Sequence, residues 1–321
     1  MHFDHTKQQD KDREEALATS YADGGTWPLE KLFFTAEKIT SEKELLAKVI
    51  REISASKTAS LMLKEASDQK WQIGLSQLNG PDFHLDIPEK RIIIESNGVK
   101  ANSCGNMPYF YHGLQLSLVR ALRDVWQEKR HGGFDEEYTP ESVLMLERVR
   151  AADRDVVAVL CASELNKAGN SGLWKHILGT ECSDLAQAFT NNLDKTTTPN
   201  PMAASFNQWF RDYGRVNHCD HETLEYMDNV MAAYPGNPFG VKRAGKICIE
   251  RLSCLPDKNA YLRGQGEEIL KAPLYAGLED SINQNHFLHI LRDSQVFIVQ
   301  DVPFRDARLA EKIFPNGLMT E

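Results

Sequence analysis

The sequence contains no long apolar run and no cysteine pattern typical of a membrane span, a zinc finger or a disulfide framework. No stretch of the chain approaches the roughly 20 apolar residues that a helix needs to cross a bilayer. The segment Met1–Asp10 lacks the apolar core of a secretory signal. Six cysteines are scattered without a C-x-x-C pair. We therefore expect a cytoplasmic protein with free thiols and no membrane partner.

Positive charge is also scarce. Lys and Arg number 37 against 46 Asp and Glu, and the net charge is -9 at pH 7. Because phosphate binding needs a basic surface, this balance argues against a nucleic-acid partner. No internal repeat or low-complexity linker divides the chain. We expect a flexible polar tail over residues 1–25 and a single α-rich domain over residues 26–321, with a helical C-terminal part.

The spacing of apolar residues predicts an α+β fold, mostly helical with a small antiparallel sheet of about three strands. Alternating patterns predict strands at 71–75, 83–87 and 91–95, separated by turn residues. Ser41 and Glu44 have the spacing of a capping box and predict that a helix begins there. Thr139 followed by Pro140 predicts another start, for a helix that extends to about residue 168.

A long amphipathic helix is predicted over residues 112–130, after the last of these strands. Apolar residues recur at helical spacing on one side, and polar residues such as Arg120 and Asp124 fall on the other. In a zincin-type metallopeptidase, a helix in this position carries a His-Glu-x-x-His motif. Its two histidines hold zinc, and its glutamate activates the bound water.

Two segments resemble a family of predicted bacterial metallopeptidases of unknown function. Residues 118–127, with the sequence LVRALRDVWQ, resemble the family phrase L-x-H-E-x-R-H-x-W-Q. Residues 150–154 resemble a Glu-Ala-Asp-Ala-like run on the next long helix, which carries the third metal ligand in this family. The resemblance implies a zincin-like fold.

Position by position, the resemblance implies that all four chemical positions are substituted. Arg120 and Asp124 stand where the two histidine ligands are expected. Ala121 stands at the general base and Ala151 at the third ligand. Arginine keeps its proton, and alanine has no acid or base group. We therefore expect no catalytic residues of the peptidase type, no bound metal and no cofactor, although the resemblance does not say what replaced the activity.

The charged residues near this position have two interpretations. In the structural one, Arg120 and Asp124 form an i, i+4 pair that Asp153 joins, and the network stabilises helix packing. In the functional one, Arg120 and Arg123 line a retained cleft, with Asp124 and Asp153 beside them. Such a cleft would bind an anionic group of an unknown peptide or protein partner.

Two other functions stay open. His218, Cys219 and His221 offer nitrogen and sulfur donors for a relocated metal or thiol site in a hydrolase, with zinc as its cofactor. The competing interpretation makes Asp220 the N-cap of a helix, with His221 and Glu222 in its first turn. The last hypothesis is a helical scaffold or interaction protein whose likeness to the metallopeptidases is only ancestral.

Overall fold

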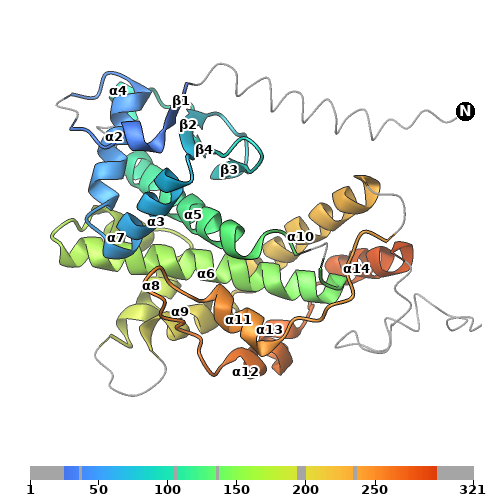
Figure 1. Cartoon of the computed structure of the whole chain (residues 1–321). Helices are drawn as coiled ribbons and strands as arrows, with labels where there is room; N and C mark the ends of the chain where they lie inside the picture. Colours follow the sequence, from blue (N-terminus) through green and yellow to red (C-terminus); the bar gives the residue numbers. More distant parts are fainter. Residues whose placement is uncertain are drawn as a thin grey trace, which may run out of the picture. The chain divides into compact units, whose positions relative to one another are not determined.

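The computed structural model describes residues 25–35, 38–104, 107–134, 137–193, 200–233 and 237–294 (Figure 1). The predicted tail over 1–25 lies, except for its last residue, outside the described residues. The chain forms two compact units, one from residues 1–130 and 154–190 and the other from residues 131–153 and 191–321. The single domain over 26–321 stays a prediction.

The first unit contains a four-stranded mixed sheet in the order β1-β2-β4-β3. Its strands are β1 (Thr26–Pro28), β2 (Gln72–Ser76), β3 (Phe83–Asp86) and β4 (Arg91–Glu95). β1 and β3 pair antiparallel with their neighbours, whereas β2 and β4 pair parallel. The predicted three-stranded antiparallel sheet was wrong in strand number and in this pairing, whereas the α+β class is confirmed.

Burial explains why β2 and β4 lie side by side. Each has three consecutive buried residues at its centre, which is typical of a strand covered on both faces. β3 exposes His84 and occupies an edge, where one face can remain in water. The two apolar strands therefore take the interior positions, and β3 pairs only with β4.

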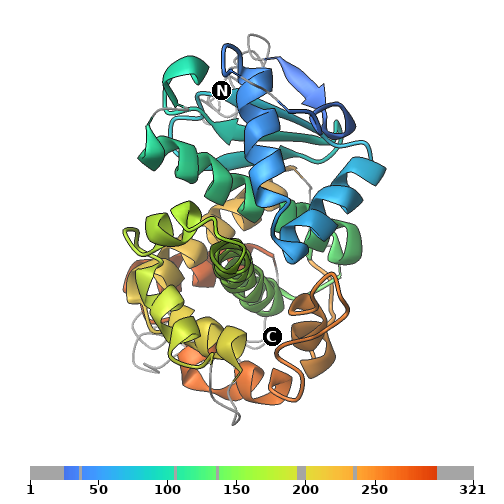
Figure 2. The same ribbon diagram turned by 90° about the vertical axis from the view of Figure 1, so that its left-hand side faces the viewer.

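The other elements of the first unit are helical. α2 packs against β2 and crosses a face of the sheet in Figure 2. The helices with their bounds are η1 (Leu29–Lys31), α2 (Glu42–Ile53), α3 (Lys57–Asp68), α4 (Ala101–Cys104), α5 (Pro108–His131), the second half of α6 (Pro140–Lys167), α7 (Gly172–Ile177) and α8 (Ser183–Thr190).

Local signals located two helix starts correctly. Ser41 and Glu44 form the predicted capping box at the start of α2. The Glu44 carboxylate accepts from the backbone N–H of Ser41 at 2.9 Å and from that of Thr40 at 2.8 Å. α6 begins at Pro140 and ends at Lys167, so its predicted extent is confirmed.

The long helix α5 is buried on more than its apolar side. Every residue from Leu114 to Arg123 is buried, including Arg120 and Arg123 on the side predicted to be polar. The side predicted to be polar does carry the polar residues, but it is covered by the protein as the apolar side is. A helix covered all round must satisfy its charged groups inside the protein, because an unpaired buried charge is costly.

Among its described residues, the second unit is helical apart from two isolated bridges. Asn283 joins α10 to α14 by donating to the Asn217 side chain at 2.6 Å and to its backbone carbonyl at 3.0 Å. Within the described residues, no helix of either unit is both long and apolar enough to cross a membrane. The helices of the second unit are the first half of α6, α9 (Pro201–Trp209), α10 (Tyr213–Ala233), α11 (Lys246–Leu252), α12 (Gly266–Lys271), α13 (Pro273–Ala276) and α14 (Ser281–Asp293).

Asp220 does not cap a helix. α10 begins at Tyr213, so Asp220 lies two turns inside it and is buried. The interpretation of Asp220 as an N-cap was wrong, because the helical pattern continues upstream through residues 213–219. Its carboxylate is bound instead by Arg148 of α6.

Candidate functional site

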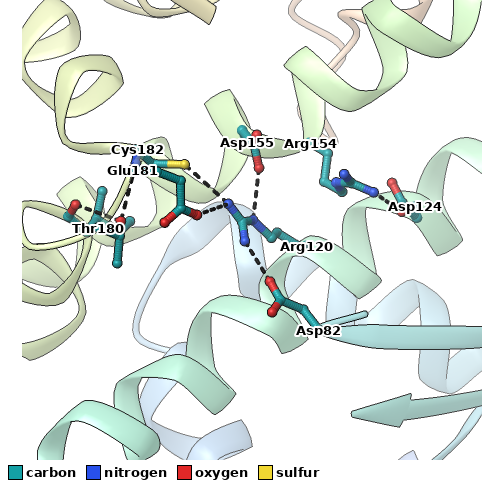
Figure 3. Close-up of polar contacts among 9 residues, drawn as sticks. Asp82, Arg120, Asp124, Arg154, Asp155, Thr180, Glu181 and Cys182 are labelled. Carbon is teal, nitrogen blue, oxygen red and sulfur yellow. Dashed lines mark hydrogen bonds and ion pairs between the residues drawn. The ribbon is translucent and has the colours of Figure 1, made fainter. Parts of the chain in front are cut away.

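A buried polar cluster in the first unit is centred on Arg120, in the middle of α5 (Figure 3). The Arg120 residue is 8% exposed. Its Nε lies 2.8 Å from Oδ1 of Asp155, a buried residue of α6. Its Nη1 donates to Oδ2 of Asp82 at 2.9 Å, in the turn before β3. Two carboxylates from different parts of the chain thus hold one guanidinium.

The turn between α7 and α8 contacts the same guanidinium from another side. Nη2 of Arg120 donates to Sγ of Cys182 at 3.2 Å and lies 4.0 Å from Oε1 of Glu181. The backbone N–H of Cys182 donates to Oγ1 of Thr180 at 3.4 Å, which helps to hold the turn in place. Figure 3 shows these groups converging on Arg120.

The surrounding groups favour the charged form of Arg120. Burial alone would lower its pKa, but the interactions with Asp155, Cys182 and Asp82 outweigh burial and raise the pKa above its ordinary value. Arg120 is therefore a permanent cation in the interior. It can donate hydrogen bonds, but it can neither accept a proton nor offer a lone pair to a metal.

Asp124 forms a different ion pair from the one predicted. Its Oδ2 accepts from Nη1 of Arg154 at 3.2 Å, and the Arg154 guanidinium lies 5.7 Å from the centre of the Phe83 ring. The i, i+4 order of Arg120 before Asp124 is the less favourable one on a helix. The expected Arg120–Asp124 pair is thus replaced by pairs that α5 makes with α6 and with the turn before β3.

Asp153 is also not the acid that meets Arg120. Its Oδ1 accepts from the Tyr261 hydroxyl at 2.8 Å in the second unit. Asp155 follows two residues later, and residues two apart on a helix do not share a face. The predicted network of Arg120, Asp124 and Asp153 is therefore replaced by one in which Asp155 is the α6 acid that contacts Arg120.

The remaining predicted positions give no open surface on α5. Ala121 and Arg123 are fully buried, and Ala151 is half-buried on α6. A cleft lined by Arg120, Arg123, Asp124 and Asp153 stays a prediction.

Sequence reasoning missed four members of the Arg120 cluster. Asp155 carried a local signal, since it follows Ala151 by one helical turn. Asp82, Glu181 and Cys182 are far from Arg120 along the chain and have no spacing that relates them to it. Only the tertiary structure brings these three residues to α5.

The proposed relocated site does not converge in the structure. His218 and His221 of α10 have side chains 72% and 51% exposed, and each lies 3.3 Å from a glutamate one turn later, Glu222 and Glu225 respectively. Cys219 is buried on another side of the helix. The three donors therefore point to different surroundings.

A known protein family matches most of the chain. The family model described as "Putative metallopeptidase family (DUF6782)" matches residues 33–262. The chain belongs to this family. No curated protein and no solved structure gave a significant match. The DUF6782 match includes β2 to β4, α5 and α6, so the Arg120 cluster lies inside the family region.

The DUF6782 description implies a metal, and the described side chains do not fit one. Within the described residues, no three His, Cys, Asp or Glu side chains gather in a way that could hold a metal ion. The buried Asp155 carboxylate is instead paired with the Arg120 guanidinium. No metal-dependent step is therefore assigned to these residues.

Proposed function

We propose that this DUF6782 protein is a cytoplasmic, zincin-like member of its family that lacks peptidase activity and retains a binding role for a peptide or protein. The observation that carries the proposal is the buried Arg120 guanidinium, held by Asp155 and Asp82. Arg120 lies on α5 at the position where the family resemblance implies the first histidine ligand.

The charge arrangement supports the loss of the metal. In a zinc peptidase, a divalent cation is held by ligands from two helices. Here the cation is a side chain of α5, and a carboxylate of α6 neutralises it. A zinc ion beside this guanidinium would be repelled, and the arginine could not bind it. In the position-by-position resemblance to the zinc peptidases, Ala121 replaces the general base and Ala151 replaces the third metal ligand.

The exposed groups at the edge of the Arg120 cluster favour a basic partner segment over an anionic one. Arg120 is already bound to carboxylates, whereas the Asp82 and Glu181 side chains are 58% and 70% exposed. The surface available to a ligand here is therefore acidic. A peptide carrying lysine or arginine complements it better than the anionic group considered from sequence alone.

A metal and activity assay tests the loss of peptidase chemistry. We expect protein purified without chelator or histidine tag to hold no stoichiometric zinc by elemental analysis. We also expect no chelator-sensitive hydrolysis of a mixed peptide library. The quadruple variant Arg120→His, Ala121→Glu, Asp124→His, Ala151→Glu is expected to gain zinc near one ion per chain if these four positions form the ancestral site.

A second variant keeps the proposal falsifiable if the quadruple variant does not fold. Zinc that is stoichiometric in the wild type and lost in His218→Ala plus His221→Ala would overturn the proposal and favour the relocated hydrolase site. Metal-dependent peptide hydrolysis that survives repeated purification would overturn it as well.

Peptide arrays test the binding role. We expect lysine-rich and arginine-rich peptides to bind more tightly than acidic ones, and the preference to weaken in Asp82→Asn plus Glu181→Gln. Asp68→Asn plus Glu89→Gln is a matched control, since these are also exposed acids of the first unit. Equal binding of basic and acidic peptides would contradict the acidic-surface argument.

A further inference from the structure

Two histidines of the first unit lie where α7 meets α5. The ring centres of His112 on α5 and His176 on α7 are 6.3 Å apart. Both residues are half-buried, and the His176 ring also meets the Tyr109 ring edge-on at 5.1 Å between centres. Because the two imidazoles are close and partly shielded from water, they cannot both become charged without strong repulsion.

Glycines allow each of these rings to approach the backbone of the opposite helix. A Cβ atom on Gly172 of α7 would overlap Cε1 and Nε2 of the His112 ring. Across the same contact, Nε2 of His176 lies 4.0 Å from the place that a Cβ atom on Gly113 of α5 would take. Nε2 of each histidine is therefore directed at the other helix.

Neutral His112 carries its proton on Nδ1. The amide nitrogen of Gln115 donates to Oε2 of Glu52 on α2 at 2.8 Å, so the Gln115 amide oxygen accepts from Nδ1 of His112 at 2.9 Å. This hydrogen bond leaves Nε2 without a proton. The Tyr111 ring, 5.5 Å from the His112 ring, adds no charge, because burial raises the Tyr111 pKa. Protonation of His112 therefore adds charge at Nε2, beside α7.

Charged groups surround His176 from three directions. Arg120 of α5 is a permanent cation, and His112 becomes one when it is protonated. Asp82 in the turn before β3 and Glu181 after α7 act in the opposite sense. Burial, followed by the interaction with His112, lowers the His176 pKa below its ordinary value, and the two acids do not reverse this direction. The His176 ring is therefore neutral at pH 7.

α7 is a short helix with a small apolar anchor. It contains six residues, of which Leu173 and Ile177 are buried. An element with so few buried side chains opens at a lower free-energy cost than the long helices of the same unit. A positive charge at the contact with α5 can therefore displace α7 without unfolding the first unit.

The turn after α7 connects the two histidines to the Arg120 cluster. The N–H of Gly179 donates to the His176 carbonyl at 2.9 Å, so this turn follows any movement of the helix end. Sγ of Cys182, three residues later, accepts from Nη2 of Arg120 at 3.2 Å. Displacement of α7 would break this contact and open one side of the guanidinium.

We propose that His112 and His176 form an acid-sensitive latch that docks α7 on α5 when both rings are neutral and releases α7, with the turn over Arg120, when they are protonated. The docked form binds fewer protons than the released form. Docking is therefore fully favoured above about pH 6.5, the ordinary midpoint of histidine, and is progressively lost as the pH falls below it. The proposal concerns conformation and does not depend on the loss of peptidase activity or on peptide binding.

Hydrogen exchange of the full chain at pH 7.5 and pH 5.5 tests the latch, with rates corrected for the pH dependence of intrinsic exchange. We expect the protection of residues 172–182, relative to α3, to fall about 3–10-fold at pH 5.5. One pH unit below its ordinary midpoint, a histidine of the released form is about tenfold more often protonated than neutral. Equal relative protection of residues 172–182 at the two pH values would overturn the proposal.

Two variants assign the pH dependence to the imidazoles. His176→Gln removes one titrating group, and we expect the change in protection of residues 172–182 between the two pH values to shrink to below about twofold. His218→Gln is a control at an exposed histidine of the second unit and should keep the wild-type change. An unaltered pH dependence in His176→Gln, or its loss in His218→Gln, would overturn the proposal.

Two further measurements keep the proposal falsifiable if His176→Gln does not fold. In His112→Gln, we expect the midpoint of the His176 titration, followed by NMR, to rise, because the neighbouring positive charge is removed. Gly172→Ala places a methyl group against the His112 ring, so residues 172–182 should lose protection already at pH 7.5. An unchanged His176 midpoint, or unchanged protection in Gly172→Ala, would show that the rings do not hold α7 and would overturn the proposal.

Discussion

Arg148 and Asp220 are joined by two parallel hydrogen bonds inside the second unit, where both side chains are almost completely buried. The same guanidinium donates from Nη1 to the backbone carbonyl of Tyr275 at 2.8 Å. One arginine of α6 therefore links α10 to α13. A bidentate pair of this kind is geometrically specific as well as strong.

Removing the arginine from this pair should be strongly destabilising. In Arg148→Met the Asp220 carboxylate stays buried without its partner, and we expect a loss of about 3–5 kcal/mol in the free energy of unfolding, measured by urea titration. Arg292→Met is a matched control on an exposed ion pair of the same unit, with an expected change below about 1 kcal/mol. Similar losses in both variants would show that burial of the Arg148 pair does not matter.

In the Arg120 cluster, the loss of stability should likewise depend on whether the removed partner of an ion pair is buried or exposed. Arg120→Met leaves the buried Asp155 unpaired, and we expect a loss of about 3–5 kcal/mol by urea titration. Asp82→Asn removes the more exposed partner of the same guanidinium and should cost only about 0–1 kcal/mol.

A double variant separates pairing from packing at this position. Arg120→Met plus Asp155→Leu removes both buried charges, so we expect it to recover most of the stability lost in Arg120→Met alone. The contrary result is a loss in the free energy of unfolding in the double variant that equals the sum of the losses in Arg120→Met and Asp155→Leu. The cluster would then act through shape and the hydrogen bond to Cys182, and not through compensated charge.

Glu164 of α6 should be important for the start of α3. Its Oε2 accepts from the Ser56 hydroxyl at 2.6 Å and from the backbone N–H of Thr58 at 2.9 Å, and its Oε1 accepts from the Thr58 hydroxyl. We expect Glu164→Ala to lower the free energy of unfolding by about 1–3 kcal/mol, because these donors lose a charged acceptor. Faster hydrogen exchange confined to the first turn of α3 would confirm the location of the effect.

The capping box of α2 should make stability depend on pH. Hydrogen bonds from Thr40 lower the Glu44 pKa from 4.5 to about 2, with a further contribution from Ser41. Since the folded pKa is depressed, the stabilisation is fully present above about pH 4.5 and is lost as the pH falls toward 2. Glu44→Gln should therefore be less stable than wild type at pH 7 in thermal melts. A stability difference that does not shrink between pH 5 and pH 2 would contradict this mechanism.

The sequence by itself determined the features that depend on neighbouring residues. The capping box at Ser41 and the start of α6 at Pro140 were predicted correctly, because a cap is formed by residues three or four positions apart. The extent of α6 and the mostly helical class follow from apolar spacing in the same local way. The phrase at residues 118–127 also indicated the family, which the match over residues 33–262 then showed.

Only the tertiary structure decided the order of the strands and the partners of the charged side chains. β2 and β4 pair in parallel and are both buried at three consecutive central residues, and nothing in the turns between them encodes the pairing. Arg120 meets Asp82 and Cys182 across 38 and 62 residues of chain. In the sequence, an arginine on the polar side of a helix gives no sign that it will be buried. Because that side of α5 is buried, the Arg120 charge needs carboxylate partners, and only the fold brings them together.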